Sequence, residues 1–361
     1  MPHVPRKILH LMPRFAVGGA ESLVLEYYRQ FDPERFTIYV GSTVEDGELR
    51  QRFPDESRVY VGSRQKQGGR LGAWRELKKY VDTLQPDIIH THLESADWFG
   101  FLLKRRYGNR VRWISTQHNV EFHTAWYRRL ISRLTLRSAD AVIAVSPAVA
   151  EYCRRYFDIP DSQLTTIPNG INLAPWLAVS TSKLCAHVPV EIASVGRLEV
   201  QKGHVFLLRA LQKVADMPWH VTVYGSGSER FHLEQLAKKF GIAQRITWAG
   251  TVFNLPERMA KTDIVVQPSL WEGLSLTVMQ AMASARPVVA SAAAGEGLLE
   301  DNKTGWIVPT GNSDLLATTL AMVLKNLPRA KAYGLAARAH AESHFSIQPH
   351  IERLAAVYDK L

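Results

Sequence analysis

Two cationic side chains and one carboxylate lie in short segments that each follow a predicted strand. Arg197 and Lys202 belong to GRLEVQKG, which comes directly after the apolar run at 190–195, and Glu272 belongs to SLWEGLS, after the run at 263–267. The carboxyl ends of parallel strands meet at one edge of a sheet, so we expect the three side chains to share a crevice. A guanidinium fork and an ammonium can bind a pyrophosphate without a metal and stabilise the charge on a departing diphosphate.

The segment around Glu272 reads as a strand–helix–strand unit. Apolar strands are predicted at 263–267 and 287–290, and the residues between 275 and 285 are helix formers without Gly or Pro. A right-handed crossover makes the two strands parallel. The free backbone N–H groups of Leu274 to Thr277 then lie at a helix N-terminus, which favours an anion. A plainer role for Glu272, as a helix-start charge, stays open.

Two further glycine pairs follow predicted strands. Gly18-Gly19 comes between a strand at 6–12 and a helix from about residue 20, and Gly225-Ser-Gly227 follows a strand at 220–224. Either pair can let a backbone approach a phosphate, and either can be a tight turn. Neither matches G-x-G-x-x-G, so the dinucleotide fingerprint is absent and a dehydrogenase is disfavoured.

Histidines mark the ends of two predicted strands in the first half of the chain. His90 and His92 end the strand that begins at 87, and His118 lies at the exit of the strand at 113–119. Of His90 and His92 we expect one to face the core, whereas the position of His118 favours a functional role. No His/Asp cluster has metal-ligand spacing, so no metal is predicted.

Alternating strands and helices run through both halves of the chain, with a polar segment at 46–70 that we expect to be mobile and an aperiodic linker at 173–188. Repeated strand–helix units predict α/β architecture with doubly wound parallel sheets. We expect two Rossmann-like domains, at 1–172 and 173–345, that face a central cleft and are followed by a last helix at 346–361.

Composition favours a cytoplasmic protein. The chain has 361 residues, of which 46% are hydrophobic and 22% charged, and only two cysteines. No apolar run approaches the ~20 residues of a membrane span, and the first residues lack a secretory signal. Two cysteines make a disulfide framework improbable, which indicates a reducing compartment.

The net charge of +10 is concentrated partly in one amphipathic segment, which carries Trp126, Tyr127 and Leu130 together with arginines at 128, 129, 133 and 137. A basic helix with aromatic residues can lie on the inner face of an anionic membrane, or can be an ordinary solvated face. No nucleic-acid motif accompanies the charge, so nucleic acid is disfavoured as a partner.

Several motifs together resemble the retaining GT-B glycosyltransferases of the large bacterial group 1 (GT4-like) family. They are GGAE at 18–21, HTHLESAD at 90–97, TQHN at 116–119, IPNGIN at 167–172, GRLEVQKG at 196–203, SLWEGLSLTVMQAMASARPVVA at 269–290 and TGWIVP at 304–309. The combination spans most of the chain and is specific, whereas each motif alone is weak. By resemblance, the N-terminal domain at 1–172 binds the acceptor, the C-terminal domain at 173–345 binds the donor, and the last helix, at 346–361, packs back on the first domain.

The resemblance implies a metal-independent hexosyltransferase without a cofactor, acting from a nucleotide-diphosphate sugar on a glycan or lipid-linked acceptor in surface polysaccharide or glycolipid synthesis. By resemblance, Arg197 and Lys202 clamp the pyrophosphate, Glu272 contacts the donor sugar, and His118 lies near its hydroxyls. The expected donor site comprises Gly18, Gly19, Gly196, Arg197, Lys202, Gly225, Gly250, Val252, Glu272, Gly273, Leu274, Ser275 and Gln280.

Gln280 departs from the family pattern, which has a glutamate there to bind the ribose. An amide keeps hydrogen bonding but loses charge assistance. Two alternatives therefore stay open: a catalytically silent GT-B binding subunit, and a nucleotide-sugar epimerase or phosphorylase on the same fold.

Overall fold

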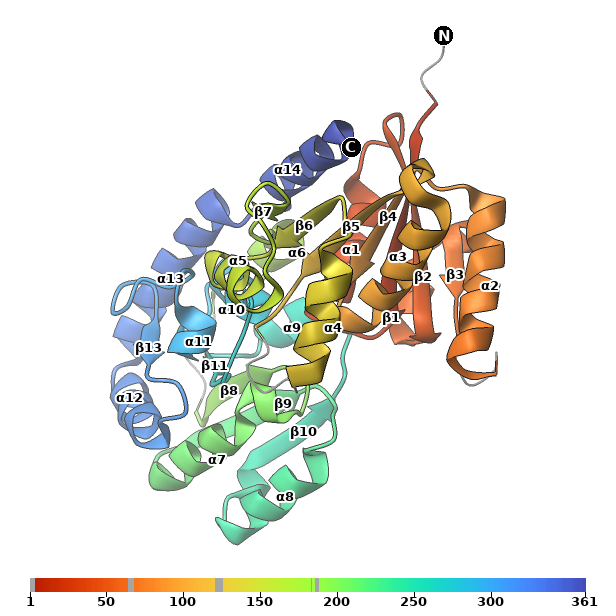
Figure 1. Ribbon diagram of the computed structural model, residues 1–361. Coiled ribbons are helices and arrows are strands. Elements are labelled where there is room, and N and C mark those ends of the chain that lie inside the picture. The colour runs from red at the N-terminus through yellow and green to blue at the C-terminus, as the bar shows by residue number, and fades with distance from the viewer. Residues whose placement is uncertain (1–3, 64–67, 121–125, 183, 186–187) are drawn as a thin grey trace. The chain divides into compact units, whose positions relative to one another are not determined.

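The computed structural model describes residues 4–63, 68–120, 126–182, 184–185 and 188–361 (Figure 1). The chain forms two compact units. Unit 1 comprises Met1–Asn169 and Gln348–Leu361, and unit 2 comprises Gly170–Ile347. The unit boundaries thus lie at 169/170 and 347/348, close to the boundaries of 172/173 and 345/346 expected from the sequence.

Unit 1 is built on a seven-stranded sheet in the order β3-β2-β1-β4-β5-β6-β7, in which all neighbouring pairs are parallel. The order reverses between β1 and β4, which is the topological switch point where ligands bind in such sheets. The strands are β1 (Arg6–Arg14), β2 (Phe36–Glu45), β3 (Val59–Val61), β4 (Ile88–His92), β5 (Arg112–Gln117), β6 (Ala141–Ala144) and β7 (Leu164–Thr166).

Helices connect these strands, as the parallel pairing requires. They are α1 (Gly19–Gln30), α2 (Gly69–Leu84), α3 (Glu94–Tyr107), α4 (Trp126–Leu136), α5 (Pro147–Tyr152) and α14 (Ile347–Lys360), with short helices at Glu48–Arg52, Glu56–Arg58, Gly108–Arg110 and Cys153–Phe157. No helix in the described part of the chain has the length and apolar composition that a membrane crossing requires.

Unit 2 repeats the plan with six parallel strands in the order β10-β9-β8-β11-β12-β13, so its switch point lies between β8 and β11. The strands are β8 (Val190–Val195), β9 (Trp219–Tyr224), β10 (Ile246–Gly250), β11 (Ile264–Gln267), β12 (Val288–Ser291) and β13 (Trp306–Val308). The helices are α6 (Ala174–Leu177), α7 (His204–Lys213), α8 (Arg230–Lys239), α9 (Leu255–Met259), α10 (Leu276–Ala283), α11 (Ala292–Gly295), α12 (Ser313–Lys325) and α13 (Leu327–His344), with short helices at Val200–Lys202 and Ala243–Arg245.

The central strand β11 shows why its sequence is continuously apolar. Ile264 and Val266 belong to a core cluster that includes residues of α7 and α12, whereas Val265 belongs to a second cluster that includes residues of α10 and α13. Successive side chains of a strand point to opposite faces, and both faces of this sheet are covered by helices. The sequence-based prediction of two doubly wound parallel sheets is therefore confirmed.

The last helix, α14, is anchored to unit 1 through polar contacts. The Arg6 guanidinium donates to the backbone carbonyl of Tyr358, and Arg35 pairs with Asp359 at 2.6 Å. Inside the unit, Tyr27 Oη lies 2.6 Å from Nε2 of His350. These contacts join the last helix to the elements of unit 1.

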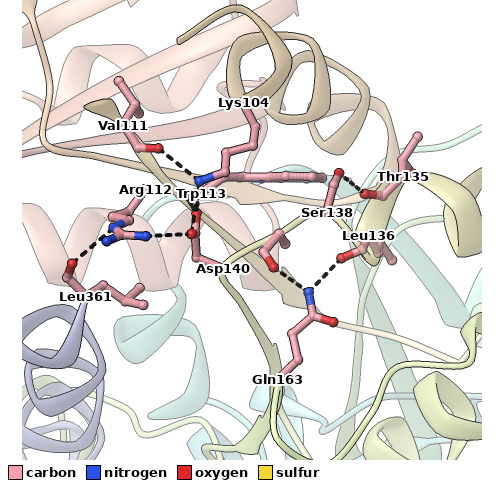
Figure 2. Close-up of polar contacts among 11 residues, drawn as sticks. Lys104, Val111, Arg112, Trp113, Thr135, Leu136, Ser138, Asp140, Gln163 and Leu361 are labelled. Atoms are coloured by element: carbon pink, nitrogen blue, oxygen red, sulfur yellow. Dashed lines mark hydrogen bonds and ion pairs between the residues drawn. The ribbon is translucent and has the colours of Figure 1, made fainter. Parts of the chain in front are cut away.

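Asp140, just before β6, joins three segments of unit 1 (Figure 2). Its carboxylate lies 2.7 Å from Lys104 Nζ at the end of α3 and 3.1 Å from Arg112 Nη1 in β5, and it accepts from the backbone N–H of Trp113 at 2.7 Å. Arg112 Nε in turn donates to the carbonyl of Leu361 at 3.1 Å. Lys104 and Arg112 therefore have a structural role within the basic first half of the chain.

Two segments without predicted structure contain regular elements. The 46–70 segment includes β3, which extends the sheet edge, and its residues 64–67 lie outside the described part of the chain. The expected linker at 173–188 includes α6, whose Trp176 is buried in the unit 2 core, while residues 183 and 186–187 are not described. Both elements are too short to produce a clear periodic pattern.

We expect Asp140→Asn to lower the free energy of unfolding of unit 1 by about 2–4 kcal/mol, because Lys104 would keep its half-buried charge without its partner. Urea denaturation followed by circular dichroism measures this change. The matched control is Asp161→Asn, since Asp161 pairs with Arg154 at 2.7 Å but its side chain is 80% exposed. Equal effects of the two substitutions would contradict the structural role of Asp140.

Candidate functional site

The switch point of unit 2 brings the predicted site segments together. β8 and β11 are neighbours, with Ile192 opposite Ile264 and Ala193 opposite Val265. Gly196 and Arg197 therefore leave one strand beside the point where the segment of Glu272 leaves the other. The arrangement follows from strand order alone, because parallel neighbours end at the same sheet edge.

Lys202 and Glu272 are in direct contact. Lys202 Nζ lies 2.6 Å from Glu272 Oε1, and the side chains are 16% and 8% exposed. The hydroxyl of Ser269 donates to the same oxygen at 2.8 Å. In turn, Gln267 Nε2 donates to Ser269 Oγ at 3.0 Å. The carboxylate is thus held by one charged and one neutral donor, a geometry that fixes its orientation.

Gln201, which the sequence analysis did not single out, connects the two segments. Its Oε1 accepts from Arg197 Nη2 at 3.2 Å, its Nε2 donates to the carbonyl of Trp271 at 2.9 Å, and its own carbonyl accepts from Leu270 N–H at 2.7 Å. Arg197 is otherwise exposed. Gln201 therefore orients a guanidinium whose remaining N–H donors are open to an anion.

Glycine permits the close approach of these loops at two positions. Gly203 has φ +66°, and a Cβ there would lie 2.0 Å from the carbonyl oxygen of Pro268. Gly225 has φ +133°, and a Cβ there would lie 2.0 Å from the carbonyl oxygen of Gly196. Gly225 N–H also donates to the carbonyl of Gly250 at 2.8 Å. The loops after β8, β9, β10 and β11 therefore contact one another through backbone.

Helix α10 begins at Leu276, directly after Gly273, Leu274 and Ser275, and Ser275 makes no side-chain cap hydrogen bond. The first N–H groups of a helix have no partner within it, so this end offers donors to an anion. Gln280 lies half-buried in the second turn, and Val252 is half-buried in the loop after β10. All the predicted site residues from Gly196 to Gln280 thus belong to unit 2.

His204, the first residue of α7, was also missed by the sequence analysis. Its side chain is buried, and neither ring nitrogen has a hydrogen-bond partner among the described residues. Burial, with a smaller contribution from the charge of Lys202, lowers the pKa of His204 to about 4. The ring is therefore neutral at physiological pH and adds no charge beside Lys202.

Gly18, Gly19 and His118 belong to unit 1. Helix α1 begins at Gly19 without a side-chain cap at Gly18, and a Cβ at Gly18 would lie 2.5 Å from Glu21 Oε2. Glycine at 18 therefore makes room for the carboxylate of Glu21, which is itself buried. Gly18 therefore also serves this local packing.

His118 is half-buried after β5 and lines a cavity of about 40 Å³ within unit 1. The other lining residues are Leu93, Glu94, Gln117, Asn119, Arg129, Ser132, Tyr152 and Phe157. The Nε2 atom of His118 lies 3.0 Å from Nδ1 of His92. Burial lowers the pKa of His118 to about 3, so the ring that faces this cavity is neutral.

Asp97 orients one wall of the same cavity. It is buried and accepts from Thr91 Oγ1 at 2.6 Å, Ser115 Oγ at 2.7 Å and Gln117 Nε2 at 2.9 Å. Burial raises the pKa of Asp97 to about 6, although the three hydrogen bonds act in the opposite direction. The motif HTHLESAD contains this carboxylate, but only the fold reveals its partners.

The expectation that only one of His90 and His92 faces the core is wrong. Both side chains are fully buried, and their rings stack with centroids 4.4 Å apart. Residues two apart on a strand point to the same face of the sheet, and that face is covered. His10 of β1, which pairs with His90 in register, is buried beside them.

Comparison with known proteins identifies the family. The family model described as Glycosyltransferase Family 4 matches residues 17–175, and the one described as Glycosyl transferases group 1 matches residues 189–326. The chain belongs to the group 1, family 4 glycosyltransferases. Each model matches most of one of the two sheets, so the family assignment rests on both units.

Individual relatives of this glycosyltransferase are distant. The lipopolysaccharide core biosynthesis mannosyltransferase LpsB of Rhizobium meliloti is 28% identical over 70% of this chain and 73% of its own. The putative glycosyltransferase EpsF of Bacillus subtilis is 24% identical over 98% and 96%. The crystal structure of Anabaena HepE in complex with UDP and glucose matches with a TM-score of 0.85 at 22% identity, covering 99% of this chain and 100% of HepE. This likeness shows the GT-B fold.

We expect Gly203→Ala to destabilise unit 2 more than Gly241→Ala. Both glycines have left-handed φ, +66° and +69°, but a Cβ at Gly241 meets nothing within 4 Å. The strain of about 1–2 kcal/mol is therefore common to both, whereas the overlap with Pro268 adds about 2 kcal/mol or more at Gly203 alone. Chemical denaturation measures the difference, and equal losses would show that the loops after β8 and β11 separate freely.

Proposed function

We propose that this chain is a retaining, metal-independent glycosyltransferase that moves a hexose from a nucleotide-diphosphate sugar to a glycan or lipid-linked acceptor. The observation that carries the proposal is the anion site at the switch point of unit 2. Lys202, the exposed Arg197 and the N-terminus of α10 lie there around Glu272. Two cations and free backbone donors suit a diphosphate, and the adjacent carboxylate suits a sugar hydroxyl.

The ion pair between Lys202 and Glu272 suggests how the site would change when a donor binds. Lys202 Nζ donates to Glu272 alone among the described residues, and Glu272 Oε2 makes no hydrogen bond to them. A diphosphate would compete for the ammonium, while Ser269 continues to hold Oε1. The carboxylate can then accept from a donor-sugar hydroxyl, and the cations stabilise the negative charge that grows on the leaving phosphate.

In the proposed reaction the acceptor oxygen attacks the anomeric carbon on the face that the leaving diphosphate occupies. The new C–O bond forms as the C–O bond to phosphate breaks, and the leaving phosphate oxygen takes the acceptor proton. No side chain has to act as a base in this scheme, which fits the neutral, hydrogen-bonded surroundings of His118. The complexes of HepE with UDP and the role named for LpsB support a nucleotide sugar and an envelope glycan.

The first experiment is a thermal-shift panel of nucleoside diphosphates and nucleotide sugars in EDTA, since a ligand of the folded state raises its melting temperature. We expect Arg197→Ala to lower the affinity for a nucleoside diphosphate about 10- to 100-fold, because charged hydrogen bonds are lost. The control is Arg230→Ala, because Arg230 is an exposed arginine whose one ion pair among the described residues is with Glu234. Stabilisation that requires a divalent metal would contradict metal independence.

The second experiment measures sugar transfer to an acceptor by wild type and Glu272→Gln. We expect about a 100-fold lower kcat for the variant, because a neutral amide stabilises the reacting sugar less than a carboxylate does. Glu234→Gln is the control, because Glu234 lies on α8 and pairs with Arg230 rather than with a residue of the site. Retention of the anomeric configuration in the product tests the stereochemistry. If the chain binds donors but transfers sugar to none of the acceptors, the silent binding subunit is favoured. If it converts the nucleotide sugar when no glycan or lipid acceptor is present, an epimerase or phosphorylase is favoured.

Contact with an anionic membrane is part of this proposal, because α4 exposes an apolar stripe. Trp126, Tyr127, Leu130, Ile131 and Leu134 are 76%, 53%, 46%, 45% and 65% exposed. They follow one another at helical spacing, so they lie on one side of α4. The arginines beside them make exposed ion pairs with Glu94 and Asp158, which are weak and can exchange for lipid phosphates. The proposed location is the cytoplasmic face of the membrane. Cys153 and Cys185 are both free thiols, which is consistent with a reducing compartment.

We expect the chain to sediment with vesicles that contain phosphatidylglycerol and to bind phosphatidylcholine vesicles weakly. The double variant Trp126→Ala/Leu134→Ser should lose about tenfold or more in affinity, because two large apolar side chains leave the interface. Phe231→Ser is the matched control, since Phe231 is 72% exposed on α8 of unit 2. Binding that is equal for both vesicle types, or unchanged in the double variant, would leave α4 as a solvated face.

A further inference from the structure

Unit 1 contains a continuous row of hydrogen-bonded rings that begins at His118. Nε2 of His118 lies 3.0 Å from Nδ1 of His92, and Nε2 of His92 lies 2.9 Å from Nδ1 of His10. Nε2 of His10 lies 3.4 Å from the hydroxyl of Tyr358, which lies 2.7 Å from Nδ1 of His90. Nε2 of His90 lies 2.6 Å from Oγ1 of Thr116. We call these six residues the relay.

Each imidazole of the relay is neutral. His10, His90 and His92 are fully buried, and burial is the largest cause that lowers the pKa of each, to about 3 for His10. A neutral imidazole has one N–H donor and one bare acceptor nitrogen. The position of the proton on one ring therefore determines its position on the next, and the relay has two self-consistent directions.

The two directions differ in whether the hydroxyl proton of Thr116 has an acceptor. In one direction, Thr116 donates to His90, Tyr358 donates to His10, and every histidine of the relay carries its proton on Nδ1. In the other direction every histidine carries it on Nε2, and Thr116 accepts, so its own hydroxyl proton has no acceptor among the described residues. A buried donor without a partner costs about 1–3 kcal/mol. The first direction instead leaves Nδ1–H of His118 without a partner among the described residues, but that ring is only half-buried and lines the cavity, whereas Thr116 is buried. The first direction is therefore the more stable.

We propose that the relay fixes His118 as a neutral hydrogen-bond donor through Nδ1–H, with His92, His10 and Tyr358 as positioning residues. The inference rests on the proposed function for its catalytic meaning. Nδ1 of His118 makes no hydrogen bond to the described residues, and the ring lines the cavity of unit 1. It would donate to a ligand oxygen such as a sugar hydroxyl, and it could not act as a general base, because Nε2 already accepts from His92. The C-terminal helix thereby takes part in the site through Tyr358.

A metal ion is the competing explanation for these histidines, since His10, His90 and His92 offer nitrogens within 4.8 Å of one another. The ring of His92, however, stacks on those of His10 and His90, with centroids 5.2 and 4.4 Å apart, and His10 and His90 are tilted relative to each other with centroids 4.9 Å apart. Their nitrogens are also engaged with one another, with Tyr358, with Thr116 and with His118. The geometry favours hydrogen bonding over ligation.

The test is ¹⁵N NMR of the full chain labelled at histidine ring nitrogens, which reports the tautomer of each ring. We expect one species in which His118, His92, His10 and His90 all carry the proton on Nδ1, with His118 assigned from a His118→Asn variant. A relay histidine that is protonated on Nε2 or on both nitrogens would overturn the proposal. So would loss of these signals on addition of Zn²⁺.

Tyr358→Phe tests the coupling at a distance. The substitution removes the hydroxyl that joins His10 to His90, so Thr116 no longer determines the direction of the segment from His118 to His10. Either direction of that segment then leaves Nε2 of His10 unpaired, and His118 should become a mixture of tautomers. Tyr27→Phe is the matched control, because Tyr27 is equally buried and its hydroxyl lies 2.6 Å from His350, outside the relay. It should leave the His118 spectrum unchanged. An unchanged spectrum in Tyr358→Phe, or equal changes in both variants, would refute the coupling.

The spectra need no substrate, so they judge the relay separately from the proposed function. Where transfer is observed, Tyr358→Phe should lower kcat/KM about two- to tenfold, since part of the population no longer offers the donor, and Tyr27→Phe should not. An intact relay in a chain without transferase activity would refute the proposed function alone. Normal activity with mixed tautomers would refute the role of His118 as the donor.

Discussion

The candidate site of unit 2 depends on the close approach of Gly203 to the backbone carbonyl of Pro268. Parallel strands place the loops after β8 and β11 at the same edge, but Lys202 reaches Glu272 at 2.6 Å only because no side chain separates the two backbones. Gln201, the residue before Lys202, then forms hydrogen bonds to the loop after β11 through both its side chain and its backbone carbonyl. Three consecutive residues thus combine close approach, charge and hydrogen bonding.

The fold could be predicted from sequence where burial dictates composition. The unit from β11 through α10 to β12 was predicted to within two residues at each boundary, since both strands are buried on both faces and contain continuous apolar runs. Helix α3 was not predicted, and Gly100 in its interior weakens the pattern. A Cβ at Gly100 would lie 2.3 Å from Nε1 of Trp113, so that glycine serves close packing of the helix on the sheet rather than ending the helix.

The candidate site was predictable as a set of positions but not as a set of contacts. Strand order brings Arg197, Lys202 and Glu272 to one edge, and this much follows from the alternating pattern. The pairing of Lys202 with Glu272 joins residues 70 positions apart, and it depends on loop geometry that spacing does not encode. The same holds for Gln201 and His204, whose types alone do not distinguish a site residue from an ordinary surface or core residue.

The two units bury polar groups in different ways, and the difference matches the groups that the proposed function would have them recognise. Unit 2 keeps charges at its switch point, with Arg197 exposed and Lys202 paired, as the proposed diphosphate would require. Unit 1 surrounds its switch point with neutral rings, in which burial removes charge and hydrogen bonds fix direction. A hydroxyl carries no net charge, so its recognition depends on where donors and acceptors point rather than on field strength. A network whose buried donors are satisfied, and whose one remaining donor on His118 faces the cavity, supplies that direction. One misplaced proton would reverse it along the whole relay.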